Sequence, residues 1–272
     1  MTLLLLLACA GTSDQLDDTA PSSDTDTDTD SDSDTDTDEP PVDADQRAEN
    51  LASGPGDYAA DFLAGTYTSL QIEVDYVAGH APDGAALEHL RSTLAELCDK
   101  PDGVEILLDD EVPDQGSPAW SYATAQALEV TWRDRYRSPD TGVAVMYYLY
   151  VDGHSESDTE AGRILGYAYH GSSLVMFAET MADVSGGLLL GLGASVEPTV
   201  LVHEAGHLLG LVNNGVDMVE DHQDTAHGHH DVSEDCIMFW AAETDAIGDL
   251  LGAGTPDFDA ECRADMRAAG GR

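Results

Sequence analysis

The first part of the folded chain shows two regular patterns of apolar residues. Residues 67–77 alternate apolar and polar positions, which is typical of a strand with one buried face. Residues 104–112 fit a second strand. Between them, residues 82–99 carry leucines at helical spacing, at Leu87, Leu90, Leu94 and Leu97. We therefore expect a strand, a helix and a strand in this order.

The middle of the chain predicts the centre of a sheet. Residues 143–151 read VAVMYYLYV, and such a nearly continuous apolar run is typical of a strand that is buried on both faces. Two shorter strands are expected at residues 164–169 and 173–179. A helix is expected at residues 120–137, and its buried side would contain Ala127, Leu128, Val130 and Trp132.

A further helix is expected at residues 195–209, because Pro198 suits a first helical turn and Gly210 ends a helix. The order is then strand, helix, strand, helix, three strands and helix. This order predicts a mixed sheet that is flanked by helices, an α/β (α+β) fold.

The chain before residue 50 lacks the composition of a folded domain. Residues 24–38 read DTDTDTDSDSDTDTD, a run of like charges that cannot form a core and is extended by self-repulsion. The first ten residues, MTLLLLLACA, resemble a bacterial lipoprotein cleavage box in which Cys9 is acylated. Their apolar run is too short to span a bilayer.

We therefore divide the chain into a lipoprotein-type signal segment (residues 1–9), a disordered acidic linker (10–49) and one folded domain (50–272). The expected location is extracytoplasmic, as a bacterial cell-envelope lipoprotein or a secreted protein. Contact with the membrane is expected only through a lipid at Cys9.

Acidic side chains outnumber basic ones by 54 to 10, which gives a formal net charge of −44. The excess is not confined to the linker, because residues 14–45 hold only 14 of the acids. Such a surface repels phosphate backbones and attracts cations and basic substrates. Nucleic acid is therefore not expected as a partner.

The segment VLVHEAGHLLGLV, residues 200–212, carries the candidate chemistry. His203 and His207 are four positions apart, so both imidazoles lie on one helix face and can bind one Zn²⁺. Glu204 lies beside them, where a carboxylate can take a proton from a zinc-bound water of lowered pKa. We expect a zinc-dependent hydrolase with one catalytic ion, in which Glu204 is the general base.

Residues 203–210, HEAGHLLG, resemble the metzincin metallopeptidases, whose pattern continues as HExxHxxGxxH and is followed by a methionine turn. His230, Cys236 and Met238 further resemble the archaemetzincin branch, although Asp231 stands in place of its first cysteine. The resemblance implies a metzincin-like five-stranded sheet with an active-site helix and a small C-terminal subdomain. It also implies an edge strand near residues 166–169 that aligns an extended peptide.

The resemblance makes His230 the third zinc ligand and Met238 the turn methionine, with residues 213–229 as an insertion. Two alternatives stay open for the third ligand. Asn213 is in register with it, but a neutral amide is a poor partner for zinc. His222 would reach the metal if the insertion folds back.

The expected function is that of a zinc-dependent endopeptidase acting on a protein or peptide substrate. The alternative is a non-catalytic, metal-binding surface lipoprotein, in which four protein ligands would close the site. A second, structural zinc is not expected, because Asp231 replaces a cysteine. In an oxidising compartment Cys236 would instead pair with Cys262 or with Cys98, whereas a reduced site would leave three buried thiols.

Overall fold

The computed structural model describes residues 44–160, 162–187, 196–251 and 255–272. Cys9, nearly all of the linker and Ser195, the first residue of the predicted motif helix, lie outside this part of the chain. Helix α1 (Ala44–Ala52) begins inside the segment assigned to the linker, and its Asn50 is buried. None of the helices in the described ranges is long and apolar enough to cross a membrane.

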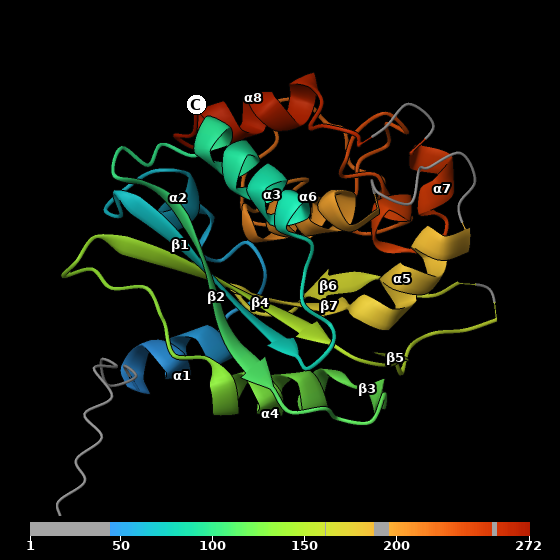
Figure 1. Cartoon of the computed structure of the whole chain (residues 1–272). Helices are drawn as coiled ribbons and strands as arrows, with labels where there is room; N and C mark the ends of the chain where they lie inside the picture. The colour runs from blue at the N-terminus through green and yellow to red at the C-terminus, as the bar shows by residue number, and fades with distance from the viewer. Residues whose placement is uncertain (1–43, 161, 188–195, 252–254) are drawn as a thin grey trace, which may run out of the picture. The chain divides into compact units, whose positions relative to one another are not determined.

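The centre of the fold is a mixed five-stranded sheet in the order β2-β1-β4-β7-β6 (Figure 1). The first four strands of this order are parallel, and β6 runs antiparallel to β7 at the edge. The strands are β1 (Ser69–Val77), β2 (Gly103–Val112), β4 (Val143–Val151), β6 (Gly166–Ala168) and β7 (Ser173–Phe177). This sheet confirms the expected α/β (α+β) fold, and each of its strands lies in a range predicted to be a strand or one residue beyond it.

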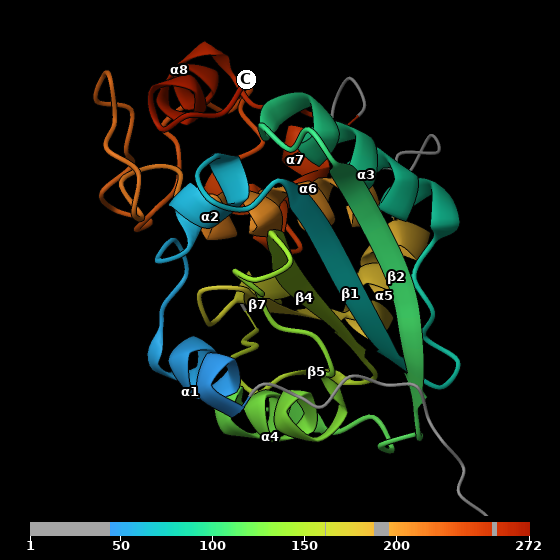
Figure 2. The same cartoon turned by 90° about the vertical axis from the view of Figure 1, so that its left-hand side faces the viewer.

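Strand β4 separates two hydrophobic clusters because its side chains alternate between the faces of the sheet. Ala144, Met146 and Tyr148 belong to the larger cluster, which includes α3 (Gly84–Leu97) and α6 (Val196–Leu208). Tyr147, Leu149 and Val151 belong to the smaller cluster, which includes residues of α4 (Tyr122–Trp132). Figure 2 shows α3 and α6 on one side of the strands and α4 on the other.

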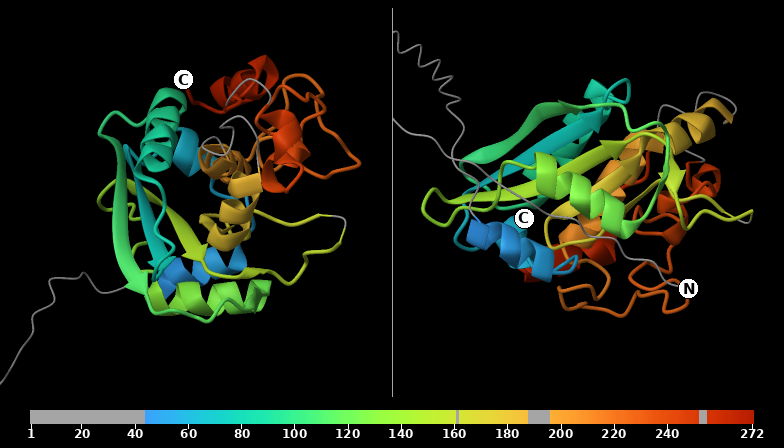
Figure 3. Two further views of the ribbon diagram at one scale, coloured as in Figure 1. Left: turned by 45° about the vertical axis from the view of Figure 1, so that its right-hand side comes forward. Right: turned by 90° about the horizontal axis from the view of Figure 1, so that it is seen from below.

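Helix α4 corrects one detail of the sequence analysis. Its fully buried positions are Ala125 and Glu129, whereas Ala127, placed on the buried side from the sequence, is exposed. Glu129 is buried because its carboxylate accepts a hydrogen bond, at 2.8 Å, from the equally buried guanidinium of Arg133. A paired charge can occupy a core position that apolar periodicity assigns to a hydrophobic residue. Figure 3 shows α4 and α1 together on this side of the sheet.

The remaining elements are short. They are α2 (Ala59–Leu63), β3 (Ala119–Trp120), β5 (His154–Ser155), α5 (Ala178–Gly187), the 3₁₀ helix η2 (Trp240–Glu243), α7 (Ile247–Leu250) and α8 (Ala260–Ala268). Strands β3 and β5 pair with each other in a separate two-stranded sheet.

The C-terminal region after Gly210 contains short helices and loops. Its buried residues Ile237, Met238 and Phe258 belong to the same cluster as α3 and α6. This small C-terminal region therefore has no separate core in its described part. It packs on the helix that carries His203 and His207.

Candidate metal centre

Helix α6 places the two motif histidines inside the protein. Every residue of the helix except Glu197 is buried, which is typical of a helix with neighbours on all sides. Glu197 attaches its first turn to the sheet by accepting a hydrogen bond, at 2.9 Å, from the hydroxyl of Tyr150 in β4. In the second half of the helix, Nε2 of His203 lies 3.2 Å from Nε2 of His207. Both imidazoles thus face one point, as their spacing predicted.

His230 completes a group of three imidazoles. Its ring stacks on that of His203, with 5.2 Å between centroids and 12° between planes. It is perpendicular to the ring of His207, at 5.0 Å. Nε2 of His230 is buried and makes no hydrogen bond of ordinary geometry to the described residues. The loop after α6 therefore folds back far enough to bring this distant histidine to the helix.

Backbone carbonyls fix two of these imidazoles in one tautomer. Nδ1 of His203 donates to the carbonyl oxygen of Ile237 at 2.7 Å, and Nδ1 of His230 donates to that of His227 at 2.6 Å. Because each Nδ1 carries the proton, each Nε2 has a free lone pair that points into the cluster. Such second hydrogen bonds orient metal-ligating histidines in proteins.

Glu243 is a fourth member of the cluster that the sequence analysis did not identify. Its carboxylate oxygens lie 3.5 Å from Nε2 of His230, 3.8 Å from Nε2 of His203 and 4.0 Å from Nε2 of His207. Its side chain is 26% exposed, whereas the three histidines are buried. Glu243 has no fixed spacing to the motif, so no sequence signal separates it from the other acids.

Glu204 lies beside the cluster and is fully buried. Its two carboxylate oxygens make no hydrogen bond of ordinary geometry within the described part of the chain. Burial and the nearby charge of Glu243 raise the pKa of Glu204 well above its usual range, and the backbone N–H of Ala168 in β6 lowers it only in part. A proton is therefore held readily at this carboxyl group.

The three imidazoles and Glu243 influence each other's protonation. Burial and the charges of neighbouring histidines hold the pKa of His207 well below its usual value. Burial lowers the pKa of His230, but the carboxylate of Glu243 outweighs this and raises it. Burial would raise the pKa of Glu243, but contacts with His203 and His230 hold it below its usual range. The neutral His207 is in the protonation state that a metal ligand needs.

The donor set and its spacing fit zinc. Two nitrogen ligands at about 2.0–2.1 Å from a tetrahedral zinc lie about 3.3 Å apart. The 3.2 Å between the Nε2 atoms of His203 and His207 agrees with that separation. The ligand atoms of His203, His207, His230 and Glu243 all lie within 4.8 Å of one another. Imidazole and carboxylate groups are ordinary zinc ligands.

The two alternative third ligands lie outside this cluster. Asn213 is exposed, and its amide donates to the side chain of Gln223 at 3.1 Å. His222 is buried, but both of its nitrogens are engaged, with Asp231 at 2.6 Å and Asp265 at 2.9 Å. The pKa of His222 is raised, because these carboxylates outweigh the effect of burial. His222 therefore links the loop to α8 as a cation.

Met238 packs directly against the motif helix α6 at Gly206. It is fully buried, and a Cβ added to Gly206 would overlap with its sulfur atom. Gly206, which lies between the two motif histidines, thus allows the methionine to approach the helix backbone. Its role as the turn methionine stays a prediction.

The thiol of Cys236 has Cys262 as its neighbour, with 3.8 Å between the sulfur atoms. Cys98 follows the last turn of α3, and all three thiols are free and buried. Of the two partners expected for Cys236, only Cys262 is therefore placed beside it.

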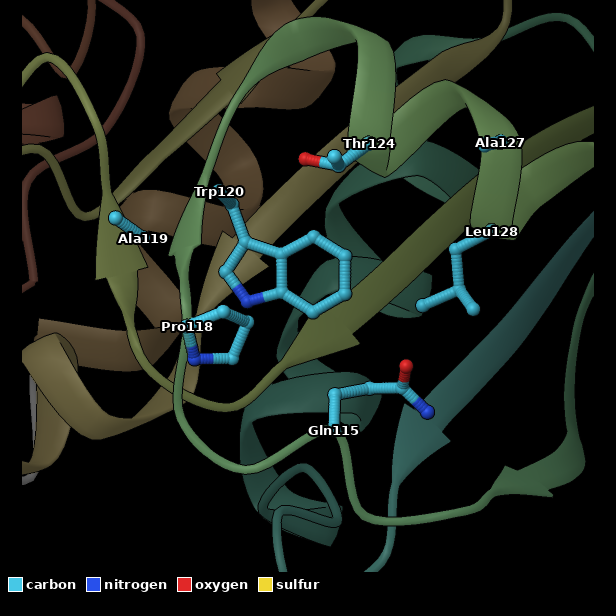
Figure 4. A pocket seen from close by; sticks show the side chains of 7 residues that line it. All are labelled: Gln115, Pro118, Ala119, Trp120, Thr124, Ala127 and Leu128. Atoms are coloured by element: carbon cyan, nitrogen blue, oxygen red, sulfur yellow. The ribbon is translucent and has the colours of Figure 1, made fainter. Parts of the chain in front are cut away.

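A separate hollow of about 340 Å³ lies next to α4 (Figure 4). Its lining consists of Gln115, Pro118, Ala119, Trp120, Thr124, Ala127 and Leu128. None of these residues belongs to the histidine cluster. The indole of Trp120 donates to the carbonyl oxygen of Asp152 at 2.6 Å, so its polar atom is already engaged.

No protein-family model and no curated protein matches the sequence. Among solved structures, the archaemetzincin of Methanopyrus kandleri is 17% identical, with a TM-score of 0.45, over 75% of this chain and 96% of its own. A zinc-dependent peptidase of Methanocorpusculum labreanum is 14% identical, with a TM-score of 0.46, over 72% of this chain and 99% of its own. These likenesses are too weak to assign an activity to this chain.

Proposed function

We propose that this protein is a zinc-dependent endopeptidase. The observation that carries the proposal is the convergence of three buried imidazole nitrogens, from His203, His207 and His230, beside the buried carboxyl group of Glu204. Burying so many polar groups is costly unless they gain partners. A metal ion and a reacting water are the partners that this arrangement suits.

The roles of the residues follow from their positions. His203, His207 and His230 would hold the ion. When bound, zinc polarises a peptide carbonyl and lowers the pKa of a water. Glu204 takes the proton of the attacking water and later passes it to the leaving amine. The raised pKa of Glu204 supports this role, because a general base must hold the proton between the two steps.

The substrate is an extended peptide that lies along β6. This strand forms an edge of the sheet, and one backbone N–H of it, that of Ala168, faces Glu204. An unpaired edge can add a further strand through backbone hydrogen bonds, which align a peptide whatever its side chains are. The negative charge of the protein favours basic peptides.

The test is the replacement Glu204→Gln. The amide preserves the shape of the side chain but cannot accept the proton, so we expect bound zinc to stay at one per chain and casein cleavage to fall by at least about 100-fold. Glu234→Gln makes the same chemical change at an exposed carboxylate and is the matched control. Undiminished cleavage by Glu204→Gln would exclude Glu204 as the base.

A second candidate function is favoured by Glu243. A site with four protein ligands has no open position for water, as in structural zinc sites. The chain would then be a metal-binding surface lipoprotein without catalysis. Stoichiometric zinc together with no cleavage of casein or of basic peptides, by the wild type or any variant at the site, would favour this function over the first.

We further propose that the protein is exported and that a lipid at Cys9 attaches it to the cell envelope. The apolar run before Cys9 and the acidic run after it support this location. The acidic run would then serve as a spacer between the membrane and the folded domain.

A further inference from the structure

The carboxylate of Glu243 lies where the metal cluster meets solvent. His203, His207, His230 and Glu204 are buried, whereas the side chain of Glu243 is 26% exposed. Of these five groups it is therefore the one that a molecule arriving from solvent contacts first.

Backbone pairing holds Glu243 in this place. We call residues 240–245 the strap. The N–H of Leu165 donates to the carbonyl oxygen of Glu243 at 2.8 Å, and the N–H of Asp245 donates to that of Arg163 at 3.0 Å. Ile164 and Thr244 form an antiparallel bridge between these bonds. The strap thus pairs with the segment that leads directly into β6, the edge proposed to receive the peptide.

The start of the strap is fixed as well. The indole of Trp240 stacks on the imidazole of His227, with 4.8 Å between ring centroids and 11° between planes. His227 also supplies the carbonyl oxygen that orients His230. Ala241 and Ala242 are buried. Glu243 is therefore connected both to the histidine loop and to the edge of the sheet.

The distances from Glu243 to the imidazole nitrogens are slightly longer than those of a fourth ligand. A nitrogen and an oxygen that share one tetrahedral zinc lie about 3.4 Å apart. The oxygens of Glu243 lie 3.5, 3.8 and 4.0 Å from the three imidazole nitrogens, so a small movement of one side chain would complete the set. An oxygen in that position occupies the place that a reacting water needs.

We propose that Glu243 is the fourth protein ligand of the metal in the resting protein, and that the substrate displaces it. The strap then keeps the peptidase latent, because Glu243 fills the fourth coordination position of the metal and the strap covers the segment next to β6. The part of this inference that concerns latency rests on the function proposed above, whereas the part that concerns ligation does not.

Zinc affinity tests the ligation. We would titrate apoprotein with Zn²⁺ in competition with a chromophoric chelator, for the wild type, Glu243→Ala, Glu243→Gln and the control Glu234→Gln. Loss of a ligand should weaken zinc binding by at least about 10-fold in both Glu243 variants and leave the control unchanged. Wild-type affinity in both Glu243 variants would overturn the proposal. Glu243→Gln preserves the side-chain shape, so a folding defect in Glu243→Ala alone would not decide the result.

The binding of a small anion to the metal tests whether Glu243 fills the fourth coordination position. We would load the same proteins with Co²⁺ and follow its visible absorption as azide, a small anionic ligand, is added. Azide should change the spectrum of Glu243→Ala and leave that of the wild type unaffected. A response of the wild type at the same azide concentration would show that the fourth coordination position is open, and it would overturn the proposal that Glu243 fills it.

Casein cleavage distinguishes the proposed role of Glu243 from the proposed peptidase function. If both hold, Glu243→Ala at saturating zinc should cleave several-fold faster than the wild type, and adding Glu204→Gln should abolish this gain. If zinc affinity falls and azide gains access but no variant cleaves, Glu243 stands as a ligand and the peptidase function fails. If Glu243→Ala cleaves more slowly than the wild type at saturating zinc, latency is overturned and the peptidase function stands.

Discussion

At the scale of single residues, the buried histidines differ in what their two ring nitrogens bind. His203 and His230 each donate one N–H to a backbone carbonyl and direct the other nitrogen into the cluster. His222 has both nitrogens against carboxylates. The first arrangement leaves a lone pair for a metal, and the second holds a cation between two anions. His222 is accordingly expected to stabilise the fold and not to bind the metal.

We predict that His222→Ala destabilises the protein but keeps its zinc. The substitution leaves Asp231 and Asp265 buried without their shared cation, which should lower the free energy of unfolding by about 3 kcal/mol. Urea unfolding and elemental analysis would measure the two effects, with His154→Ala as the control because His154 is exposed. A variant of normal stability that loses zinc would assign His222 to the metal instead.

The contribution of His222 should also depend on pH. Its pKa is raised in the folded protein, so its stabilisation is fully present below the unfolded value of about 6.5 and is lost as pH rises through the folded pKa. The difference in unfolding free energy between wild type and His222→Ala should therefore be larger at about pH 6 than at about pH 9. A difference that grows with pH would contradict the ion pair.

The sequence predicts the part of this site that is local. His203, Glu204 and His207 follow from the four-residue spacing on one helix. The choice among His230, His222 and Asn213 depends on how the loop folds, and spacing alone left it open. Glu243 is positioned by a backbone hydrogen bond to Leu165, far away in the sequence, which no motif records.

At the scale of elements, the position of the motif helix α6 depends on the close packing of Met238 against its backbone. Met238 packs against α6 where Gly206 lacks a side chain, and Phe258 lies beside it. The neighbouring carbonyl of Ile237 orients His203. The position of the metal ligand and the packing of the methionine are therefore set by the same short segment. The sequence predicted the helix and strand β4 well because their apolar patterns are strong. It missed the buried Glu129 of α4 because apolar periodicity does not register a charge that is paired with Arg133, one helical turn away.

We predict that Gly206→Ala lowers the free energy of unfolding by about 1–3 kcal/mol, because the new Cβ overlaps with the sulfur of Met238. Met238→Ala should remove this conflict, so the double variant should be more stable than the sum of the two single effects allows. Denaturant unfolding of the four proteins in this cycle measures the coupling. Strict additivity would show that the helix and the methionine do not touch in solution.

At the scale of the whole molecule, a strongly acidic chain combines one folded unit with an N-terminal segment of different composition. The net charge of −44 disfavours contact with the negative charges of nucleic acids and anionic membranes. The membrane attachment that we propose therefore relies on a covalent lipid, with Cys9 as the candidate site. This assignment depends on sequence alone, because Cys9 lies outside the described residues.

We predict that the protein incorporates labelled palmitate when produced in a bacterial host and is recovered with the membrane fraction. Cys9→Ala should remove both the label and the membrane association, because it deletes the acylated thiol. Cys98→Ala changes a buried thiol of the folded domain and should keep both. Label that persists in Cys9→Ala would place the lipid elsewhere or argue against a lipoprotein.

The most direct test of the metal centre is the zinc content of the purified protein and of three variants, His230→Ala, His222→Ala and Asn213→Ala, by elemental analysis. The structure brings His230 alone of these three to His203 and His207. We therefore predict about one zinc per chain in the wild type, in His222→Ala and in Asn213→Ala, and a nearly complete loss in His230→Ala. Full zinc in His230→Ala, together with loss in either of the other variants, would contradict this account.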